Sequence, residues 1–249
     1  MGPGLGLTFA AYLFGSLPFV YLLGRWRGLD LRTVGSRNIG GTNLWQRAGA
    51  PLGLLGGLLD AAKGVLPVVA GKALGMDLAW VALAGLAGVA GQMWPLFLKF
   101  KGGRGVAAGM GFAFTLGLWQ AMVSVSVMLV AILRWGVPHL RSILGRRCLQ
   151  TPHTEAGDVA GASLRHRLSF AGRQTHMVPV SMLASFASAP LLTWLLGRET
   201  EVVLGCLGLL VLIVGRRVSA ELRADMAQGS GLGGRLWHRL LYDRAADEG

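Results

Sequence analysis

The strongest constraint on this chain is a series of apolar stretches, each close to the length of a membrane-spanning helix. In the 249-residue sequence they cover 4–24, 51–74, 78–98, 106–133, 177–196 and 201–215. About 20 apolar residues in a helix cross the hydrocarbon core of a bilayer. Charged residues make up only 14% of the chain, against about 25% in typical soluble domains. The sequence therefore predicts an all-α membrane protein that crosses the bilayer several times.

The apolar stretch 106–133 is long for one crossing and short for two. A break within 116–120 would divide it into two short crossings, over 105–118 and 119–134. The choice between one crossing and two decides on which side of the membrane the following polar segment, 135–175, would lie.

The distribution of basic residues favours the break. With seven crossings and the N-terminus outside, only Lys72 and Arg198 lie on the outer side and Lys63 lies within a helix, so 21 of the 24 lysines and arginines face the cytoplasm. A single crossing would move the seven arginines of 134–173 outside, against the positive-inside rule. We therefore predict a polytopic bundle of about seven transmembrane helices, N-out and C-in.

These crossings divide the chain into four predicted parts. They are 1–134, with transmembrane helices 1–5; 135–175, a basic cytoplasmic insertion; 176–215, with transmembrane helices 6–7; and 216–249, a cytoplasmic tail. The first part also contains two polar loops, 25–50 and 99–105, which hold most of the residues that could carry chemistry.

The net charge of +12 is compatible with nucleic acid, anionic lipid or an anionic substrate as partner. The basic residues are spread over every predicted loop on one membrane face, and no aromatic-rich nucleic-acid module accompanies them. Orientation in the membrane and attraction to anionic lipids account for most of them. We therefore expect membrane lipids as partners and no nucleic acid. The histidine and cysteine spacings predict neither a metal site nor a cofactor, and no pattern indicates an oligomeric state.

The first polar loop contains a cluster of small, hydroxyl and amide residues between Val34 and Asn43. Its glycines permit backbone shapes that expose N–H groups. The side chains that could bind an anionic, hydroxylated substrate are Ser36, Asn38, Thr42, Asn43 and the nearby Arg47. The alternative is an ordinary turn in which Thr42 or Asn43 caps a short helix.

The second polar loop reads Lys101-Gly-Gly-Arg-Gly105 and directly precedes an apolar helix. Glycines let a backbone close around phosphate oxygens, and a helix N-terminus offers free N–H groups and a positive dipole end. Lys101 and Arg104 add positive charge, and Gly102, Gly103 and Gly105 supply the flexible backbone. The alternative is a tight cytoplasmic turn with orienting charges.

Asp60 and Lys63 are ionisable residues inside the second apolar stretch. At a spacing of three they share one helix face. Charged groups within membrane helices usually face the bundle interior or water. The pair is either functional or a structural ion pair.

Several motifs in one order resemble the bacterial integral-membrane glycerol-3-phosphate acyltransferases that use acyl-phosphate as donor. These motifs are Gly15-Ser-Leu-Pro-Phe19, Leu22-Leu-Gly-Arg25, Val34-Gly-Ser-Arg-Asn-Ile-Gly-Gly-Thr-Asn43, Leu59-Asp-Ala-Ala-Lys-Gly-Val-Leu-Pro67 and Trp94-Pro-Leu-Phe-Leu-Lys-Phe-Lys-Gly-Gly-Arg-Gly-Val-Ala107. The resemblance covers 12–112 closely, weakens over 113–133 and 175–215, and is absent over 135–174.

The resemblance implies a seven-helix fold with its site at the cytoplasmic face. It implies transfer of an acyl group from acyl-phosphate to the 1-hydroxyl of glycerol 3-phosphate, giving lysophosphatidic acid. By the resemblance, the site lies in the bacterial inner membrane, Ser36 and Asn38 contact substrate, and Lys101, Gly102, Gly103, Arg104 and Gly105 hold phosphate. Together with the residue patterns above, this gives Ser36, Asn38 and Arg104 as candidate catalytic residues. The candidate substrate and phosphate ligands are Arg47, Thr42, Asn43, Lys101, Gly102, Gly103 and Gly105, and the candidate supporting residues are Asp60, Lys63 and Arg217.

The chain departs from the family pattern at four places. Gln46 stands where the family usually has arginine, with Arg47 next to it, and Arg104 replaces a lysine. Gln92 stands where the family often has histidine. After the last helix, 216–220 lacks the family's histidine and asparagine, with Arg217 and Ala220 in their places.

Three functions remain compatible with these residues. The first is an active, divergent glycerol-3-phosphate acyltransferase. The second is a paralogue that binds a phosphorylated lipid precursor with little or no catalysis. The third is a small membrane transporter, which should show paired broken helices or polar residues near the bilayer midplane.

Overall fold

The computed structural model describes residues 2–117 and 177–228, with side chains over 2–117 and 183–219. The elements are α1 (Gly2–Gly15), α2 (Phe19–Trp26), α3 (Gly41–Ala48), α4 (Ala50–Ala73), α5 (Leu78–Met93), the 3-10 turn η1 (Leu96–Leu98), α6 (Val106–Leu116), α9 (Met177–Leu195) and α10 (Thr200–Gln228). The described part of the chain is thus helical, as predicted.

Apolar length divides these helices into two groups. Four spans are long and apolar enough to cross a membrane: Gly2–Trp26, Ala50–Ala73, Leu78–Leu98 and Thr200–Ser219. Val106–Leu116 and Leu183–Leu195 are shorter apolar helices. These spans confirm an all-α, multi-pass membrane protein.

The ends of two helices lie near predicted boundaries. α6 ends at Leu116, inside the predicted break, while the predicted crossing 119–134 and insertion 135–175 lie outside the described residues. α10 continues as a helix to Gln228, so the first residues of the predicted tail, 216–228, are helical.

The first crossing is broken, whereas the sequence analysis treated 4–24 as one helix. α1 ends at Gly15 and α2 begins at Phe19. The cause is Pro18, which has no backbone N–H and cannot continue a helical hydrogen-bond ladder. Ser16 in the break is fully buried, and its hydroxyl donates to the Tyr12 carbonyl at 2.9 Å.

Glycines set how closely the helices pack. A Cβ on Gly15 of α1 would run into the backbone carbonyl of Gly88 in α5. A Cβ on Gly64 of α4 would likewise meet the carbonyl of Ala108 in α6. Small residues at such seams let membrane helices approach at backbone distance. Gly15 and Gly64, two of the 39 glycines, therefore allow close helix packing.

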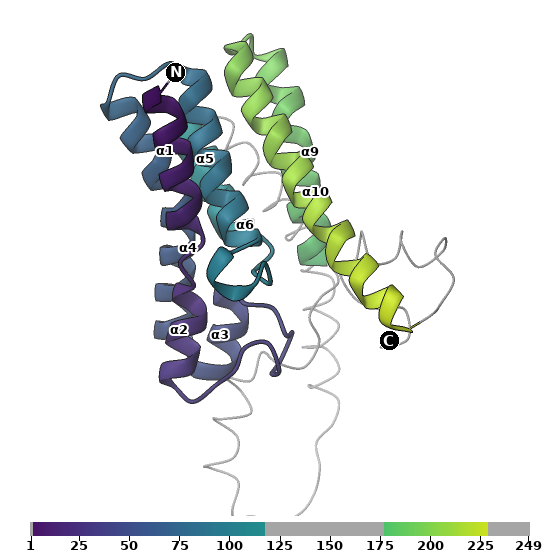
Figure 1. Cartoon of the computed structure of the whole chain (residues 1–249). Helices are drawn as coiled ribbons and strands as arrows, with labels where there is room; N and C mark the ends of the chain where they lie inside the picture. The colour runs from purple at the N-terminus through teal and green to yellow at the C-terminus, as the bar shows by residue number, and fades with distance from the viewer. Residues whose placement is uncertain (1, 118–176, 229–249) are drawn as a thin grey trace, which may run out of the picture.

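A single buried cluster joins the N-terminal helices to the C-terminal pair. Phe112 of α6 is fully buried and packs with Val68 of α4, Val89 of α5, and Leu209 and Ile213 of α10. Figure 1 shows α9 and α10 as an antiparallel pair beside α5 and α6. This packing brings the part of α10 around Arg216 close to the loop that precedes α6.

The two ends of the bundle differ in charge. The N-terminus and the α9–α10 turn lie at one end, and the loops that precede α3 and α6 lie toward the other (Figure 1). The segments 25–49 and 96–105, toward the second end, carry one acidic residue, Asp30, and the basic residues Arg25, Arg27, Arg32, Arg37, Arg47, Lys99, Lys101 and Arg104. The segments 74–77 and 197–201, at the first end, carry Arg198 with Asp77, Glu199 and Glu201.

Candidate functional site

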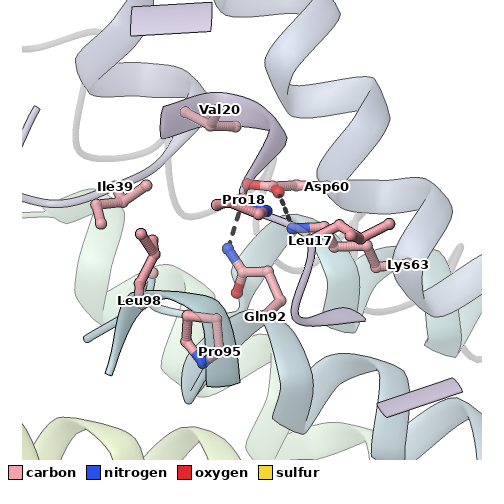
Figure 2. Close-up of a pocket in the computed structure, with 11 residues that line it drawn as sticks. Leu17, Pro18, Val20, Ile39, Asp60, Lys63, Gln92, Pro95 and Leu98 are labelled. Carbon is pink, nitrogen blue, oxygen red and sulfur yellow. Dashed lines mark hydrogen bonds and ion pairs between the residues drawn. The ribbon is translucent and has the colours of Figure 1, made fainter. Parts of the chain in front are cut away.

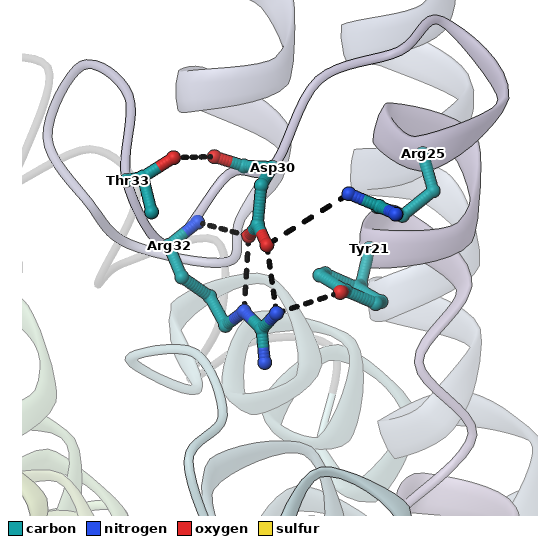
Figure 3. Close-up of polar contacts among 5 residues, drawn as sticks. All are labelled: Tyr21, Arg25, Asp30, Arg32 and Thr33. Carbon is teal, nitrogen blue, oxygen red and sulfur yellow. Dashed lines mark hydrogen bonds and ion pairs between the residues drawn. The ribbon is translucent and has the colours of Figure 1, made fainter.

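The segment 27–40, which we call the serine loop, is fixed at its start by a charged network. Asp30 accepts hydrogen bonds from the Arg32 backbone N–H at 3.0 Å and from its guanidinium at 2.9 and 2.7 Å. Arg32 also donates to the Tyr21 hydroxyl at 2.9 Å, and Arg25 lies 3.9 Å from Asp30 (Figure 3). The hydrogen bonds from Arg32 lower the pKa of Asp30 to about 2. The network ties the loop to α2.

Asn43 of α3 organises the middle of the serine loop. Its side-chain amide donates to the carbonyls of Leu31, Val34 and Asn38 at 3.2, 3.1 and 3.0 Å. Its side-chain oxygen accepts the backbone N–H of Ser36 at 3.3 Å. Asn43 is only 1% exposed. The structure thus shows Asn43, predicted as a substrate ligand, in a loop-shaping role.

Gly35 gives the serine loop its shape next to Ser36. It has a left-handed φ of 61°, and a Cβ there would lie 2.8 Å from the Arg47 Nε and collide with the Asn43 side chain. The Arg47 side chain therefore lies directly against the serine loop. Ser36, Thr42 and Arg47 are all exposed. Ser36 and Arg47 are thereby neighbours at the surface of this end.

The segment 99–105, which we call the glycine loop, follows the turn η1. Lys99 and Phe100 adopt left-handed φ values of 53° and 61°, and Gly105 has a φ of 76° as the N-cap of α6. The Gly103 N–H donates to the Gln92 carbonyl at 3.1 Å. Left-handed non-glycine residues are uncommon and concentrate at functional sites. The loop delivers Lys101 and Arg104 to the N-terminus of α6.

The serine loop and the glycine loop meet. A Cβ on Gly103 would lie 2.6 Å from the Ile39 carbonyl oxygen. Ile39, Gly102 and Gly103 line one small pocket together with Leu17 and Pro18 of the helix break. Figure 2 shows the pocket with Gln92 and Pro95 at its edge. Two segments that are distant in sequence thus form one surface.

The floor of this pocket is a buried ion pair. Lys63 lies 2.9 Å from Asp60, and both residues are about 97–98% buried. Gln92 donates from its side-chain amide to Asp60 at 3.2 Å (Figure 2). The Lys63 ammonium lies 5.4 Å from the centre of the Phe19 ring. The charge of Asp60 is therefore balanced by Lys63 within the protein. Through Gln92 and Phe19, the pair connects α4 to α5 and α2.

Gln92 combines two contacts that the sequence analysis did not predict. Its backbone carbonyl holds Gly103, and its side chain holds Asp60. Its buried side-chain oxygen has no hydrogen-bond partner among the described residues. The sequence showed only that Gln92 stands where the family often has histidine. This difference did not indicate that Gln92 contacts Gly103 and Asp60.

Arg216 of α10 is the residue that the sequence analysis missed. Its Nε donates to the Gly103 carbonyl at 3.0 Å, and its Nη2 donates to the Gly102 carbonyl at 2.8 Å. Its guanidinium lies 5.9 Å from the centre of the Trp94 ring. The sequence analysis named the neighbouring Arg217, which is 8% exposed. The sequence signal for Arg216 was a pair of arginines directly after the last apolar stretch.

The site therefore consists of a serine loop, a glycine loop before a helix N-terminus, and arginines from three elements. Such a set of N–H groups and cations is suited to phosphate groups. The described residues contain no group of three or more metal-binding side chains. Fold and site define an integral-membrane helical protein in which two polar, basic loops meet at one end of the bundle.

Comparison with known proteins gives the family. Residues 5–152 match the family model for glycerol-3-phosphate acyltransferase. A glycerol-3-phosphate acyltransferase of Anaeromyxobacter sp. (strain K) is 38% identical over 174 residues, which cover 68% of this chain and 84% of the relative. The chain belongs to the glycerol-3-phosphate acyltransferase family.

Other relatives match over shorter regions. The enzyme of Geobacter metallireducens is 48% identical over 105 residues, which cover 42% of this chain and 54% of the relative. Glycerol-3-phosphate acyltransferase 4 of Dehalococcoides mccartyi is 40% identical over 121 residues, covering 48% of this chain and 52% of the relative. The chain thus spans about half the length of these two relatives.

The fold also matches a solved structure. The integral membrane glycerol 3-phosphate acyltransferase PlsY, in its glycerol 3-phosphate form, aligns with a TM-score of 0.66 and 28% identity. The alignment covers 93% of this chain and 96% of PlsY. A lysophosphatidic acid form of PlsY aligns with a TM-score of 0.64.

Proposed function

We propose that this protein transfers a fatty acyl group from acyl-phosphate to the 1-hydroxyl of glycerol 3-phosphate. The product is lysophosphatidic acid, an intermediate of phospholipid synthesis. The observation that carries the proposal is the contact between the serine loop and the glycine loop at Ile39 and Gly103. It is supported by family membership and by the two ligand forms of PlsY.

The proposed chemistry needs little beyond binding and alignment. Acyl-phosphate already carries a good leaving group, so the enzyme holds two phosphorylated molecules and aligns a hydroxyl with a carbonyl carbon. A bond forms between the 1-hydroxyl oxygen and the acyl carbon, and the bond from that carbon to phosphate oxygen breaks. The hydroxyl proton is lost to the departing phosphate or to water. No cofactor takes part.

The site residues divide between these tasks. Lys101, Arg104 and the N–H groups at the start of α6, directly after Gly105, bind phosphate and stabilise developing negative charge. Gly102 and Gly103 shape the loop that carries these groups. Ser36 and Asn38 contact the reacting groups, and the exposed Thr42 and Arg47 complete the binding surface beside them. The pair of Asp60 and Lys63 supports the floor, and Arg217 supports the arginine cluster.

The test is transfer activity in purified membranes with acyl-phosphate and labelled glycerol 3-phosphate. The expected result is labelled lysophosphatidic acid that depends on the expressed protein. Absence of product, beside a working acyltransferase control, would reject the enzyme and favour the paralogue that only binds a phosphorylated precursor. Labelled substrate that accumulates inside vesicles without conversion would favour a transporter.

Ser36→Ala tests the catalytic assignment within this site. We expect a strong fall in turnover with normal membrane insertion, because the exposed hydroxyl would contact the reacting groups. Thr33→Ala is the matched control, because Thr33 is an exposed residue of the same loop. Its hydroxyl donates to the backbone carbonyl of Asp30 at 3.0 Å. Full activity in Ser36→Ala would contradict the assignment of Ser36.

The proposed orientation places the site at the cytoplasmic face of the inner membrane. The native cysteines allow a direct test, because Cys148 lies in the predicted cytoplasmic insertion and Cys206 is only 4% exposed. An impermeant maleimide should label Cys148 only after spheroplasts are permeabilised. Arg198→Cys, in the α9–α10 turn, should react in intact spheroplasts. The reverse pattern would invert the orientation.

A further inference from the structure

Arg216 is a cation beside the proposed phosphate site, but it donates hydrogen bonds to protein carbonyl groups. Its two hydrogen bonds run to consecutive glycine carbonyls, at 3.0 Å to Gly103 and 2.8 Å to Gly102. A guanidinium offers several donors in a rigid fork, so it can hold two acceptors at once. The half-buried side chain also lies near the Trp94 ring, 5.9 Å from its centre. Contacts on two sides fix its position.

These hydrogen bonds set the orientation of two peptide planes in the glycine loop. The C=O and N–H groups on either side of a trans peptide bond point in opposite directions. The Gly102 carbonyl points to Arg216, and the N–H of the same peptide plane, on Gly103, donates to Gln92. The Gly103 carbonyl also points to Arg216, so the N–H of that plane points away from it.

The orientation has an electrostatic consequence for an anionic substrate. A carbonyl oxygen carries partial negative charge and would repel a phosphate group, whereas an N–H group attracts it. Glycine peptides rotate readily, so a free loop would present both groups. Holding the carbonyls on the side of Arg216 keeps their partial negative charge away from a phosphate bound among the cations on the other side.

We infer that Arg216 is a positioning residue, which clasps the glycine loop from α10 and fixes its carbonyls away from the phosphate. The inference rests on the proposed function for its effect on catalysis. The clasp itself is a property of the protein without substrate. It also makes the C-terminal helix pair a part of the site, because the described N-terminal helices supply no substitute for these two hydrogen bonds.

The test compares Arg216→Met, which keeps a long apolar side chain, with Arg216→Lys, which keeps the charge but lacks the fork. Amide hydrogen exchange is measured in the substrate-free, detergent-solubilised protein. We expect exchange over 101–105 to rise about tenfold or more in Arg216→Met and to rise less in Arg216→Lys. Exchange over 30–38 should stay at the wild-type rate, which reports that each variant is folded.

Kinetics then give the catalytic part of the inference. We expect Arg216→Met to raise the KM for glycerol 3-phosphate or acyl-phosphate and to lower kcat, with partial recovery in Arg216→Lys. Arg198→Met, at the opposite end of the bundle, should match the wild type. Unchanged exchange over 101–105 in Arg216→Met would overturn the clasp. If the wild type transfers no acyl group, the proposed function fails, while the exchange experiment still decides whether the clasp exists.

Discussion

The serine loop and the glycine loop lie side by side but are held by different means. The serine loop is held from nearby in sequence, by Asp30 with Arg32 and by Asn43. The glycine loop is held from nearby by the α5 residue Gln92 and also from a distance by Arg216, which is 113 residues beyond Gly103. One loop can therefore be disturbed from within its own segment, and the other from the last helix of the bundle.

The difference teaches that two neighbouring parts of one site can have separate structural supports. Local hydrogen bonds keep a loop ordered without help from the rest of the bundle. A loop held by a residue that is distant in sequence instead depends on the packing of the helix that carries this residue. Mutations of the residues that hold one loop should therefore affect that loop more than the other.

The largest expected effect comes from Gly103→Ala, at the point where the loops touch. A Cβ there would lie 2.6 Å from the Ile39 carbonyl and would also meet the Gln92 side chain, so the glycine loop must shift. A shift of about 1 Å in a substrate-positioning group can reduce activity about 100-fold. We expect a loss of that order in kcat/KM, measured in the acyl-transfer assay.

Gly6→Ala is the control for Gly103→Ala, because a Cβ on Gly6 would meet nothing within 4 Å. It should leave activity at the wild-type level. Equal activity in the two variants would mean that the loops have room to adjust and that their contact does not position substrate.

Asn43→Asp should produce an intermediate effect confined to the serine loop. The carboxylate cannot donate, so the carbonyls of Leu31, Val34 and Asn38 lose their shared donor. A buried group without its partner costs about 1–3 kcal/mol. We expect a lower melting temperature, roughly tenfold lower activity, and faster amide exchange over 30–38 with little change over 101–105.

Gln46→Glu is the control on the same helix, since Gln46 is exposed. It introduces the same charge without disturbing the serine loop and should leave the exchange over 30–38 unchanged. An increase in exchange over 101–105 that equals the increase over 30–38 would show that the two loops are not independent.

The smallest expected effect comes from Asp30→Asn. At neutral pH the variant loses the charged hydrogen bonds to Arg32, so exchange at the start of the serine loop should rise only a few-fold, because the network is exposed to solvent. The wild-type carboxylate has its pKa lowered from 3.8 to about 2, so its contribution is present above 3.8 and is lost as the pH falls toward 2.

The pH dependence provides the check on Asp30→Asn. The ratio of variant to wild-type exchange rates should stay constant from neutral pH down to about pH 4. It should then approach one as the pH falls toward 2. A ratio that changes near neutral pH would assign the effect to a group other than Asp30.

The sequence predicted the parts of the molecule that depend on local patterns. Apolar length gave the membrane helices, and the Gly-rich segments gave the two loops. The spacing of Asp60 and Lys63 predicted their shared face, and the structure pairs them at 2.9 Å. α6 ends at Leu116, within the predicted break, while the crossing predicted to follow it lies outside the described residues.

The contacts made across the bundle could not be predicted in the same way. Pro18 carried a visible signal for the break in the first crossing, but apolar length alone hid it. The role of Asn43 depends on where the loop carbonyls fall in space, and the role of Arg216 depends on how α10 packs beside α5 and α6. The spacing of residues along the sequence predicts neither role.

The clasp from α10 has a consequence for the synthesis of the protein. A ribosome adds about 5–20 residues per second, so the 113 positions between Gly103 and Arg216 take roughly 6–23 s to translate. During that interval the carbonyls of the glycine loop have no α10 arginine to bind. The newly made chain therefore cannot form the hydrogen bonds from Arg216 to the glycine loop until α10 has been synthesised.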